Sequence, residues 1–370
     1  MVNAPPVTTG KALELLRAGW RAQQAGTLTA SWMLHGRPGI GKTEIVQDLA
    51  TFIGARLYDL RLTTIEPQDL RGLPFFDLER QRTVWFRPED LPDDPAQPSV
   101  LFLDELTAAP PQLQPTVYGL LQERRVGPHR LPDSCLVVAA GNTVEDGAVA
   151  YEIGTALSDR LIHLNLVAET NDWVQSYAVP HGLDPAVIAF IRTRPDLLDT
   201  IESALRRGDM IACSPRSWAR VAALMRAIPE RTLRQTAIAG VVGEAVAAEF
   251  LLIADDIAAT VQIDELLDAK PKDRLELYPP SMHGMTALVY ALIARADAET
   301  LPRIIEIMAE ARDLGQTRGA PFSSMPLAEL GAHGFEMLIR RALDNGWQEA
   351  FLDSPAYAAY AEERRAAGLE

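Results

Sequence analysis

The sequence contains few lysines and few cysteines. Only four of its 35 basic residues are lysine, namely Lys11, Lys42, Lys270 and Lys272. A lysine inside a glycine-rich segment therefore stands out against this background. The two cysteines, Cys135 and Cys213, lie far apart in apolar surroundings and lack the spacing of metal ligands. They predict buried thiols in a reducing compartment and exclude a disulfide framework or a cysteine-rich zinc site.

The sequence also lacks a basic balance and a segment that could span a membrane. Its net charge of −15 and pI of about 4.9 disfavour a protein that holds duplex DNA by neutralising phosphates, although a local basic channel stays compatible with them. Glu244 and Glu249 interrupt the longest apolar stretch, residues 237–254. The first ten residues have neither the basic start nor the apolar core of a signal peptide. We therefore expect a soluble cytoplasmic protein without a membrane partner.

The 370 residues, 48% of them hydrophobic, are enough for two or three domains with a sizeable core. Up to residue 165, short apolar runs alternate with helical stretches such as Lys11–Gln23, which predicts an α/β fold with a parallel sheet. The Pro- and Asp-rich stretch Glu66–Pro98 is expected to form surface loops and short turns. The predicted strands are Ser31–His35, Arg56–Leu60, Val100–Leu103, Cys135–Ala140 and Leu161–Leu166.

After Leu166 the pattern is almost entirely helical. Ser214 is a suitable N-cap and Pro215 suits the first position of the helix that follows. Thr232–Ala254 reads as one long helix rich in Ala and Val. Further helices are expected over residues 284–297, 300–313, 326–344 and 355–366.

The segment GRPGIGKTE follows the first predicted strand and has the spacing G-x-x-x-x-G-K-T. Glycines let backbone amides close around phosphates, and the N-terminus of the helix Glu44–Phe52 adds its dipole. Lys42 is expected to reach the β- and γ-phosphates of a nucleotide, and the Thr43 hydroxyl to bind Mg²⁺. The residues expected around the phosphates are Gly36, Arg37, Pro38, Gly39, Ile40, Gly41, Lys42, Thr43 and Glu44.

Two acidic residues, Asp104 and Glu105, end the apolar strand SVLFL. At the carboxyl end of a strand, Asp104 would complete the Mg²⁺ site and Glu105 would polarise a water for attack on the γ-phosphate. Surface acids that cap the next helix are the alternative interpretation. An acid directly after a metal-binding Asp favours hydrolysis over transfer to a small acceptor.

Three further polar residues are candidates for contact with the nucleotide. Asn142 ends a buried strand and would orient the water or contact the γ-phosphate, although Asn is also an ordinary turn residue there. Arg160 precedes the last strand, and Arg216 lies in the first turn of the helix capped by Ser214. A guanidinium offers phosphate oxygens a fixed fork of donors, whereas a solvated surface Arg is the alternative for both.

In their order along residues 31–218, these motifs resemble those of AAA+ ATPases, and in particular the MoxR-type, helix-2-insert branch. The segments that carry the resemblance are GRPGIGKTE, FRPEDLP, LFLDELTAAPPQLQPTVYGLLQERRV, VVAAGNTVEDGAVAYEIGTALSDRLIHLNL and SPRSW. The sequence departs from the family pattern twice: AAG precedes Asn142 where A-T-x is common, and Leu161 follows Arg160 where family members usually have an aromatic residue. The resemblance also implies an inserted hairpin at Val126–Pro132.

The resemblance implies a role for each matching residue. Lys42 and Thr43 become the Walker A residues and Asp104 and Glu105 the Walker B pair. Asn142 matches sensor 1, and Arg216 matches sensor 2 of a helical lid. Arg160 matches the arginine finger, which acts on ATP bound in the neighbouring subunit of a ring.

The implied architecture is an αβα sandwich with a five-stranded parallel sheet (residues 1–167), a helical lid (168–254) and a C-terminal helical extension (255–370). For the extension, contact with a partner and simple packing onto the lid stay open. The implied protein is an ATP- and Mg²⁺-dependent chaperone or motor in a homo-oligomeric ring, commonly a hexamer. Its client would be a protein, with a von Willebrand factor A domain as one candidate. A nucleic-acid motor and a nucleotide-gated scaffold are the alternatives.

Overall fold

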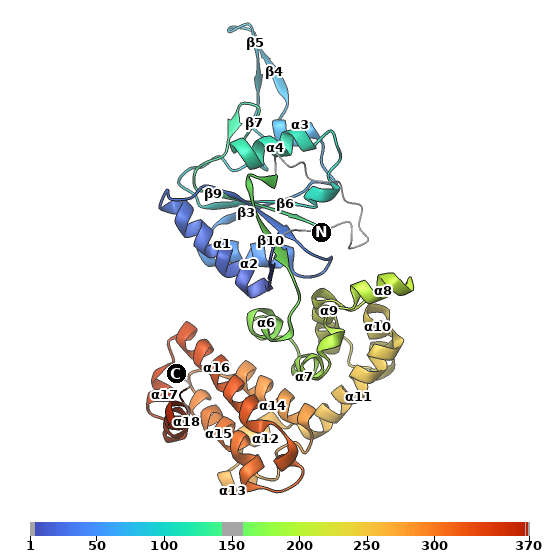
Figure 1. Ribbon diagram of the computed structural model, residues 1–370, viewed down its shortest axis with the longest axis vertical. Helices are drawn as coiled ribbons and strands as arrows, with labels where there is room; N and C mark the ends of the chain where they lie inside the picture. The colour runs from blue at the N-terminus through green and yellow to red at the C-terminus, as the bar shows by residue number, and fades with distance from the viewer. Residues whose placement is uncertain (1–3, 143–157, 367, 369–370) are drawn as a thin grey trace. The chain divides into compact units, whose positions relative to one another are not determined.

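The computed structural model describes residues 4–142, 158–366 and 368 (Figure 1). The chain divides into two compact units, which are described separately. Unit 1 comprises Met1–Trp173, Asp199–Met210 and Ser214–Arg216, and unit 2 comprises Val174–Leu198, Ile211–Cys213 and Ser217–Glu370. None of the described helices is long and apolar enough to cross a membrane.

Unit 1 is built on a six-stranded sheet in which all the neighbouring strands are parallel. The order across the sheet is β1 (Pro6–Val7), β10 (Leu161–Leu166), β2 (Ser31–His35), β9 (Cys135–Gly141), β6 (Ser99–Asp104) and β3 (Arg56–Arg61). The five strands predicted from the sequence are all present, with ends that differ by at most one residue. The sixth, β1, was not predicted, because two residues that include a proline give no strand pattern.

Helices cover both faces of this sheet, as the αβα prediction requires (Figure 1). On one face, α1 (Thr9–Gln24) and α2 (Lys42–Ile53) bury Leu16 and Leu49 against strand residues such as Phe102. On the other face, α4 (Gln114–Glu123) buries Val117 and Leu120 in a core that includes Leu101. The three strands in the middle of the sheet, β2, β9 and β6, are buried along their whole length, which explains their nearly continuous apolar sequences.

The prediction of loops and short turns for Glu66–Pro98 was incomplete. This stretch contains α3 (Pro67–Arg71) and an antiparallel hairpin of β4 (Pro74–Asp77) and β5 (Arg82–Trp85), which projects from the unit in Figure 1. Most of its side chains are exposed and none is fully buried, so the sequence lacks the alternation of a half-buried strand. The hairpin expected at Val126–Pro132 is present as β7 (Arg125–Val126) and β8 (His129–Arg130). A 3-10 turn (Leu106–Ala108) links β6 toward α4.

The residues from 199 to 216 that belong to unit 1 contribute α8 (Ile201–Arg207) and the start of α9 (Pro215–Ala227). Just before unit 2, α6 (Thr170–Trp173) is tied to the start of α1. The Asp172 carboxylate accepts hydrogen bonds from the Thr8 and Thr9 hydroxyls at 2.7 and 2.9 Å.

Unit 2 is helical. Phe190 of α7 (Pro185–Thr193), Trp218 of α9 and Phe250 of α11 (Glu244–Thr260) form an aromatic cluster in its core, with ring centroids 5.3–5.9 Å apart. The expected C-terminal helices correspond to α14 (Met282–Arg295), α15 (Leu301–Thr317), α16 (Leu327–Asn345) and α18 (Pro355–Ala366). Shorter segments complete the unit, namely a π-helical turn (Val174–Ala178), 3-10 turns (Pro195–Leu197 and Phe322–Ser324), α12 (Ile263–Asp268), α13 (Pro271–Arg274) and α17 (Glu349–Leu352).

The single long helix predicted over Thr232–Ala254 is instead two helices. The first, α10 (Arg231–Val242), ends at Gly243, and α11 begins at Glu244. Gly243 has φ 89° and ψ 154°, a conformation open to glycine but strained for other residues. The apolar pattern continues across the break, so periodicity alone could not reveal it.

Candidate functional site

The polar residues that the sequence singled out lie where the parallel strands end. His35, Asp104 and Gly141 are the last residues of β2, β6 and β9, which are neighbours in the order β2-β9-β6. Ligands of open α/β sheets gather at this carboxyl edge. The loop after β2 and the residues after β6 and β9 therefore form one candidate site.

The loop between β2 and α2 has the backbone geometry of an anion cradle. Gly39 and Gly41 have φ values of 79° and 109°, in the left-handed region that favours glycine. A Cβ atom on Gly39 would also lie 2.7 Å from Ser214 Oγ. Both the backbone conformation and this close contact therefore disfavour a side chain at position 39. Because α2 begins at Lys42, the amides of its first turn are directed at this loop. These features fit a phosphate group.

The Lys42 ammonium group lies across the mouth of the loop. It donates hydrogen bonds to the carbonyl oxygens of Gly36 and Arg37, at 2.5 and 3.1 Å, and to Asn142 Oδ1 at 2.8 Å. One cation thus connects the loop after β2 with the residue after β9. All three acceptors are oxygens, the same kind of partner that a phosphate would offer.

Asn142 is fixed from its backbone side as well. Its carbonyl oxygen accepts a hydrogen bond of 2.9 Å from the Thr107 hydroxyl. A Cβ atom on Gly141 would lie 2.6 Å from the same threonine. The glycine before Asn142 therefore makes room for Thr107, which holds the Asn142 backbone while its side chain contacts Lys42.

Asp104 is a buried carboxylate, with 9% of the residue exposed. Burial raises its pKa, and the Glu105 backbone N–H, which donates to Asp104 Oδ1 at 2.9 Å, opposes this effect. A desolvated carboxylate gains from a nearby cation. With the Thr43 hydroxyl on the first turn of α2, Asp104 offers the hard oxygen donors that Mg²⁺ prefers, so this pair fits a magnesium ion.

Glu105 has an unusual backbone and a held side chain. Its φ of 60° and ψ of 34° are left-handed, which is uncommon for a residue other than glycine and is typical of functional sites. Its carboxylate accepts a hydrogen bond from the Thr63 hydroxyl and lies 3.8 Å from the Arg61 Nε atom. Arg61 ends β3 and Thr63 follows it, so the neighbouring strand restrains the acid.

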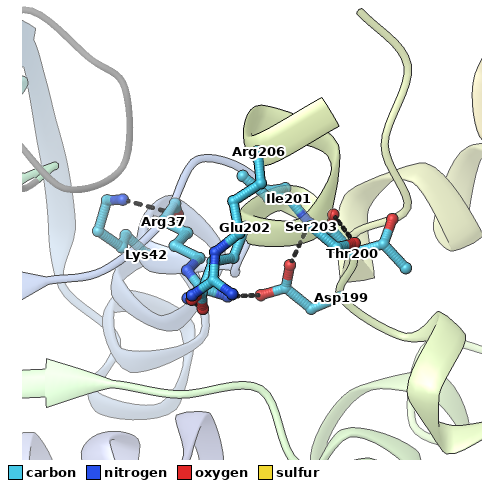
Figure 2. A network of polar contacts seen from close by, with 8 residues as sticks. All are labelled: Arg37, Lys42, Asp199, Thr200, Ile201, Glu202, Ser203 and Arg206. Atoms are coloured by element: carbon cyan, nitrogen blue, oxygen red, sulfur yellow. Dashed lines mark hydrogen bonds and ion pairs between the residues drawn. The ribbon is translucent and has the colours of Figure 1, made fainter. Parts of the chain in front are cut away.

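Arg37, the second residue of the loop, faces acidic residues in and before α8 (Figure 2). Its guanidinium forms an ion pair with Asp199 at 3.5 Å and a hydrogen-bonded pair with Glu202. Glu202 is also bonded to Arg206 one turn further along α8. The hydrogen bond from Arg37 is the main cause that lowers the pKa of Glu202. Exposed pairs add little stability, but this network links the loop to the segment before Arg216.

Arg216 reaches the same loop through its backbone. Its N–H donates to the Gly39 carbonyl at 3.1 Å, and its Cβ would lie 3.4 Å from a Cβ on Gly39. The Arg216 side chain is exposed. The second predicted phosphate-binding arginine therefore starts beside the cradle.

Arg160 lies at the amino ends of the parallel strands, whereas the glycine-rich loop lies at their carboxyl ends. Leu161, the first residue of β10, is paired with Ser31, the first residue of β2, whereas the glycine-rich loop follows His35 at the other end. At ~3.3 Å per residue, the length of β2 separates the two edges by about 15 Å. The exposed Arg160 side chain instead donates a hydrogen bond to Gln122 of α4. The structure does not bring Arg160 to the loop of its own chain.

Part of the chain is similar in sequence to known proteins. A model of the family described as "ATPase family associated with various cellular activities (AAA)" matches residues 31–163. The chaperone MoxR1 of Mycobacterium tuberculosis is 26% identical over 178 residues, which are 46% of this chain and 45% of MoxR1. Residues 31–163 thus match the ATPase domain of this family, and the likeness to MoxR1 supports its MoxR-type branch. Mouse ATPase family gene 2 protein homolog B is 36% identical to this chain over 115 residues.

The chain and these relatives match one another over only part of their lengths. The chain spans 45% of MoxR1 and 13% of the mouse protein, which itself matches 31% of this chain. Among solved structures, the RuvB Holliday junction branch migration motor of Thermotoga maritima has a TM-score of 0.36 and 15% identity, covering 77% of this chain and 80% of its own.

Several residues that shape the site were not predicted. Thr63 and Arg61 hold Glu105, Thr107 holds Asn142, and Asp199 and Glu202 hold Arg37. Each is an ordinary residue type far from its partner in the sequence. Only the position of Arg61 and Thr63 at the end of a predicted strand was a usable signal.

Proposed function

We propose that this protein hydrolyses ATP with the help of Mg²⁺ in the MoxR-type domain. The observation that carries the proposal is the joining of the glycine-rich cradle to Asn142 by Lys42, at the sheet edge where Asp104 and Glu105 also lie. This set provides a cation for phosphate oxygens, oxygen donors for a metal and a carboxylate for water. A scaffold that only binds nucleotide would not need Glu105.

In this proposal the loop amides and Lys42 hold the phosphates and keep the γ-phosphate in line for attack. Thr43 and Asp104 would hold Mg²⁺, and the ion would supply positive charge that stabilises negative charge on the phosphates. Glu105 accepts a proton from the attacking water, and Asn142 orients that water through its amide. Arg216 donates hydrogen bonds to phosphate oxygens from the far side of the cradle.

A lysine substitution tests the binding half of the proposal. We expect Lys42→Ala to abolish Mg²⁺-dependent release of phosphate from ATP, with a fall of about 10²–10³-fold, because a preorganised charge on the phosphates is lost. Lys11→Ala, which removes an exposed lysine of α1, is the matched control and should stay at the wild-type rate. Turnover is measured with and without EDTA. Equal turnover of Lys42→Ala and wild type would contradict the proposal.

The hydrogen bond from the Thr63 hydroxyl to the Glu105 carboxylate predicts that it restrains the basal rate of ATP turnover. Thr63→Val removes the hydroxyl that binds the Glu105 carboxylate, so we expect basal turnover to rise about 2- to 5-fold, the equivalent of ~0.5–1 kcal/mol for one net hydrogen bond. Thr63→Ser keeps the hydroxyl and should behave as wild type. Steady-state turnover at saturating ATP measures the change. A lower rate in Thr63→Val would mean that Thr63 positions Glu105 for the reaction.

We also propose that the chain works in a homo-oligomeric ring, with a hexamer as the expected size, in which Arg160 acts on ATP in the next subunit. This proposal is supported by the position of Arg160, which lies at the amino ends of the strands, whereas the glycine-rich loop of the same chain lies at their carboxyl ends. The helical lid (168–254) and the extension (255–370) stay predictions, and α11 runs through residue 254. The cytoplasmic location is likewise a prediction.

For the client, we propose a protein, with a von Willebrand factor A domain partner as one candidate. Phe75 and Phe76 of the β4–β5 hairpin are 57% and 58% exposed, with the exposed Phe86 ring 5.3 Å from Phe75. Exposed apolar surface of this kind is typical of binding sites. A Glu105→Gln form that holds ATP without turning it over would retain the client for identification. Salt-sensitive stimulation by DNA would instead favour the nucleic-acid motor.

A further inference from the structure

Two histidines on the neighbouring strands β2 and β10 are in contact with each other. His35 ends β2, and His163 lies on the neighbouring strand β10, where it is paired with Met33. A residue and the one two positions beyond its partner are diagonal neighbours on one face of a sheet. The two rings are stacked, with centroids 5.0 Å apart and planes 18° apart, and His35 Nε2 lies 2.7 Å from His163 Nδ1.

The hydrogen bonds of the pair have a definite direction. His163 Nε2 lies 2.9 Å from the Ser158 carbonyl oxygen, which can only accept, so this nitrogen carries a proton. Ser158 Oγ lies 3.1 Å from the same nitrogen. In the neutral pair, His163 Nδ1 then accepts a hydrogen bond from His35 Nε2–H. Burial, followed by the charges of His163 and Lys42, lowers the pKa of His35 to about 4, which keeps this ring neutral.

These contacts connect the glycine-rich loop with the turn that carries Arg160. His35 is covalently joined to Gly36, the first residue of the loop, and only 6% of it is exposed. Ser158 lies two residues before Arg160. Arg160 itself precedes the strand, because the pairing of β10 with β2 begins at Leu161. His35, the His163 ring and the Ser158 carbonyl thus form a chain of contacts from the glycine-rich loop to the turn that carries Arg160.

We propose that His163, braced by His35, is a positioning residue that sets where Arg160 meets the ATP of the neighbouring subunit. This inference rests on the proposed ring and trans-acting arginine. A displacement of about 1 Å in a group that contacts the transition state can cost up to ~10²-fold in rate. The hydrogen bond from His163 Nε2 to the Ser158 carbonyl holds the backbone two residues before Arg160 and is suited to prevent such a displacement. In this role the His163 side chain acts without contact with ATP.

The test uses mixed rings in which one subunit supplies only the arginine. Glu105→Gln keeps Arg160 but lacks the base, and Arg160→Ala keeps the base but lacks the arginine. His163→Phe, which retains a flat ring and loses both nitrogen contacts, is added either to the Glu105→Gln donor or to the Arg160→Ala acceptor. We expect the donor combination to lose about 10-fold of the restored ATPase activity and the acceptor combination to stay within ~2-fold.

His163→Gln is the conservative variant, because its amide can again donate to the Ser158 carbonyl. On the donor it should return most of the activity that His163→Phe loses. If His163→Phe does not assemble, as judged by mass photometry, His163→Asn takes its place, since its shorter amide does not reach Ser158. Equal losses on donor and acceptor, or no loss on the donor, would overturn the inference. Failure of the unmodified mixture, with active wild type, would instead overturn the trans arginine itself.

Discussion

Mixing two inactive variants, Glu105→Gln and Arg160→Ala, should restore ATP hydrolysis. Alone, each is expected to lose activity, by about 10³–10⁵-fold for the arginine in systems where it acts in trans. In a ring, a Glu105-bearing site of the Arg160→Ala chain can face an Arg160 from the Glu105→Gln chain. With random 1:1 assembly, a site is intact with a chance of ½ × ½, so about a quarter of wild-type activity is expected.

The geometric reason is the parallel register of β10 and β2. Because Leu161 is paired with Ser31, Arg160 stands at the amino edge of the sheet and the glycine-rich loop at the carboxyl edge. An arginine side chain does not bridge the ~15 Å along the strand. If Arg160 acts on ATP at all, that ATP belongs to another chain.

The measurement is steady-state phosphate release from each variant alone and from a titration of one into the other. Mass photometry on the same samples establishes that both variants assemble. Arg56→Ala is the matched control for Arg160→Ala, because Arg56 is an exposed arginine at the amino end of β3, as Arg160 lies at the amino end of β10. It should leave turnover unchanged. Assembled mixtures without restored activity would show that Arg160 does not act in trans.

Five strands of the sheet could be predicted from the sequence, and the three in its middle, β2, β9 and β6, are buried along their whole length. An apolar run such as Val100–Leu103, bounded by a turn and an acid, has few other stable arrangements. Elements that bury little were harder to predict. The exposed β4–β5 hairpin lacks a pattern, and the break at Gly243 depends on one backbone conformation inside an unbroken apolar sequence.

For the site, the sequence indicated residues whose chemistry is rare in their context, such as Lys42 between glycines and Asp104 after an apolar strand. It could not indicate the residues that hold them. Thr63 and His163 are unremarkable in sequence. The contact of Thr63 with Glu105 arises only when β3 meets β6, and that of His163 with His35 only when β10 meets β2. Such roles depend on strand order and register, which local patterns do not specify.

Asp104→Asn should abolish activity while it stabilises the nucleotide-free fold. The folded protein raises the pKa of Asp104, mainly by burial, so the ionised form is less stable in the folded state than in the unfolded chain. An amide of the same size carries no charge and removes this penalty. The loss of a metal-binding carboxylate should cost about 10²–10³-fold in turnover, as for other preorganised electrostatic groups.

The sign of the pH dependence follows from the same shift. For a carboxyl group whose folded pKa is raised, the favourable contribution is present below the unfolded pKa and is lost as the pH rises through the folded pKa. The gain in Tm of Asp104→Asn over wild type should therefore be largest near pH 7–8 and shrink toward pH 4. Asp90→Asn, a change at an exposed aspartate of unit 1, should show no such trend.

Magnesium provides the decisive comparison. With a non-hydrolysable ATP analogue, added Mg²⁺ should raise the Tm of wild type, since a ligand that binds only the folded state stabilises it by mass action. The same addition should have little effect on Asp104→Asn, because its amide no longer offers the anionic oxygen that the ion requires. Differential scanning fluorimetry across pH, with and without Mg²⁺, measures both effects. A variant with lower Tm and undiminished Mg²⁺ response would assign Asp104 to the core and remove it from the metal site.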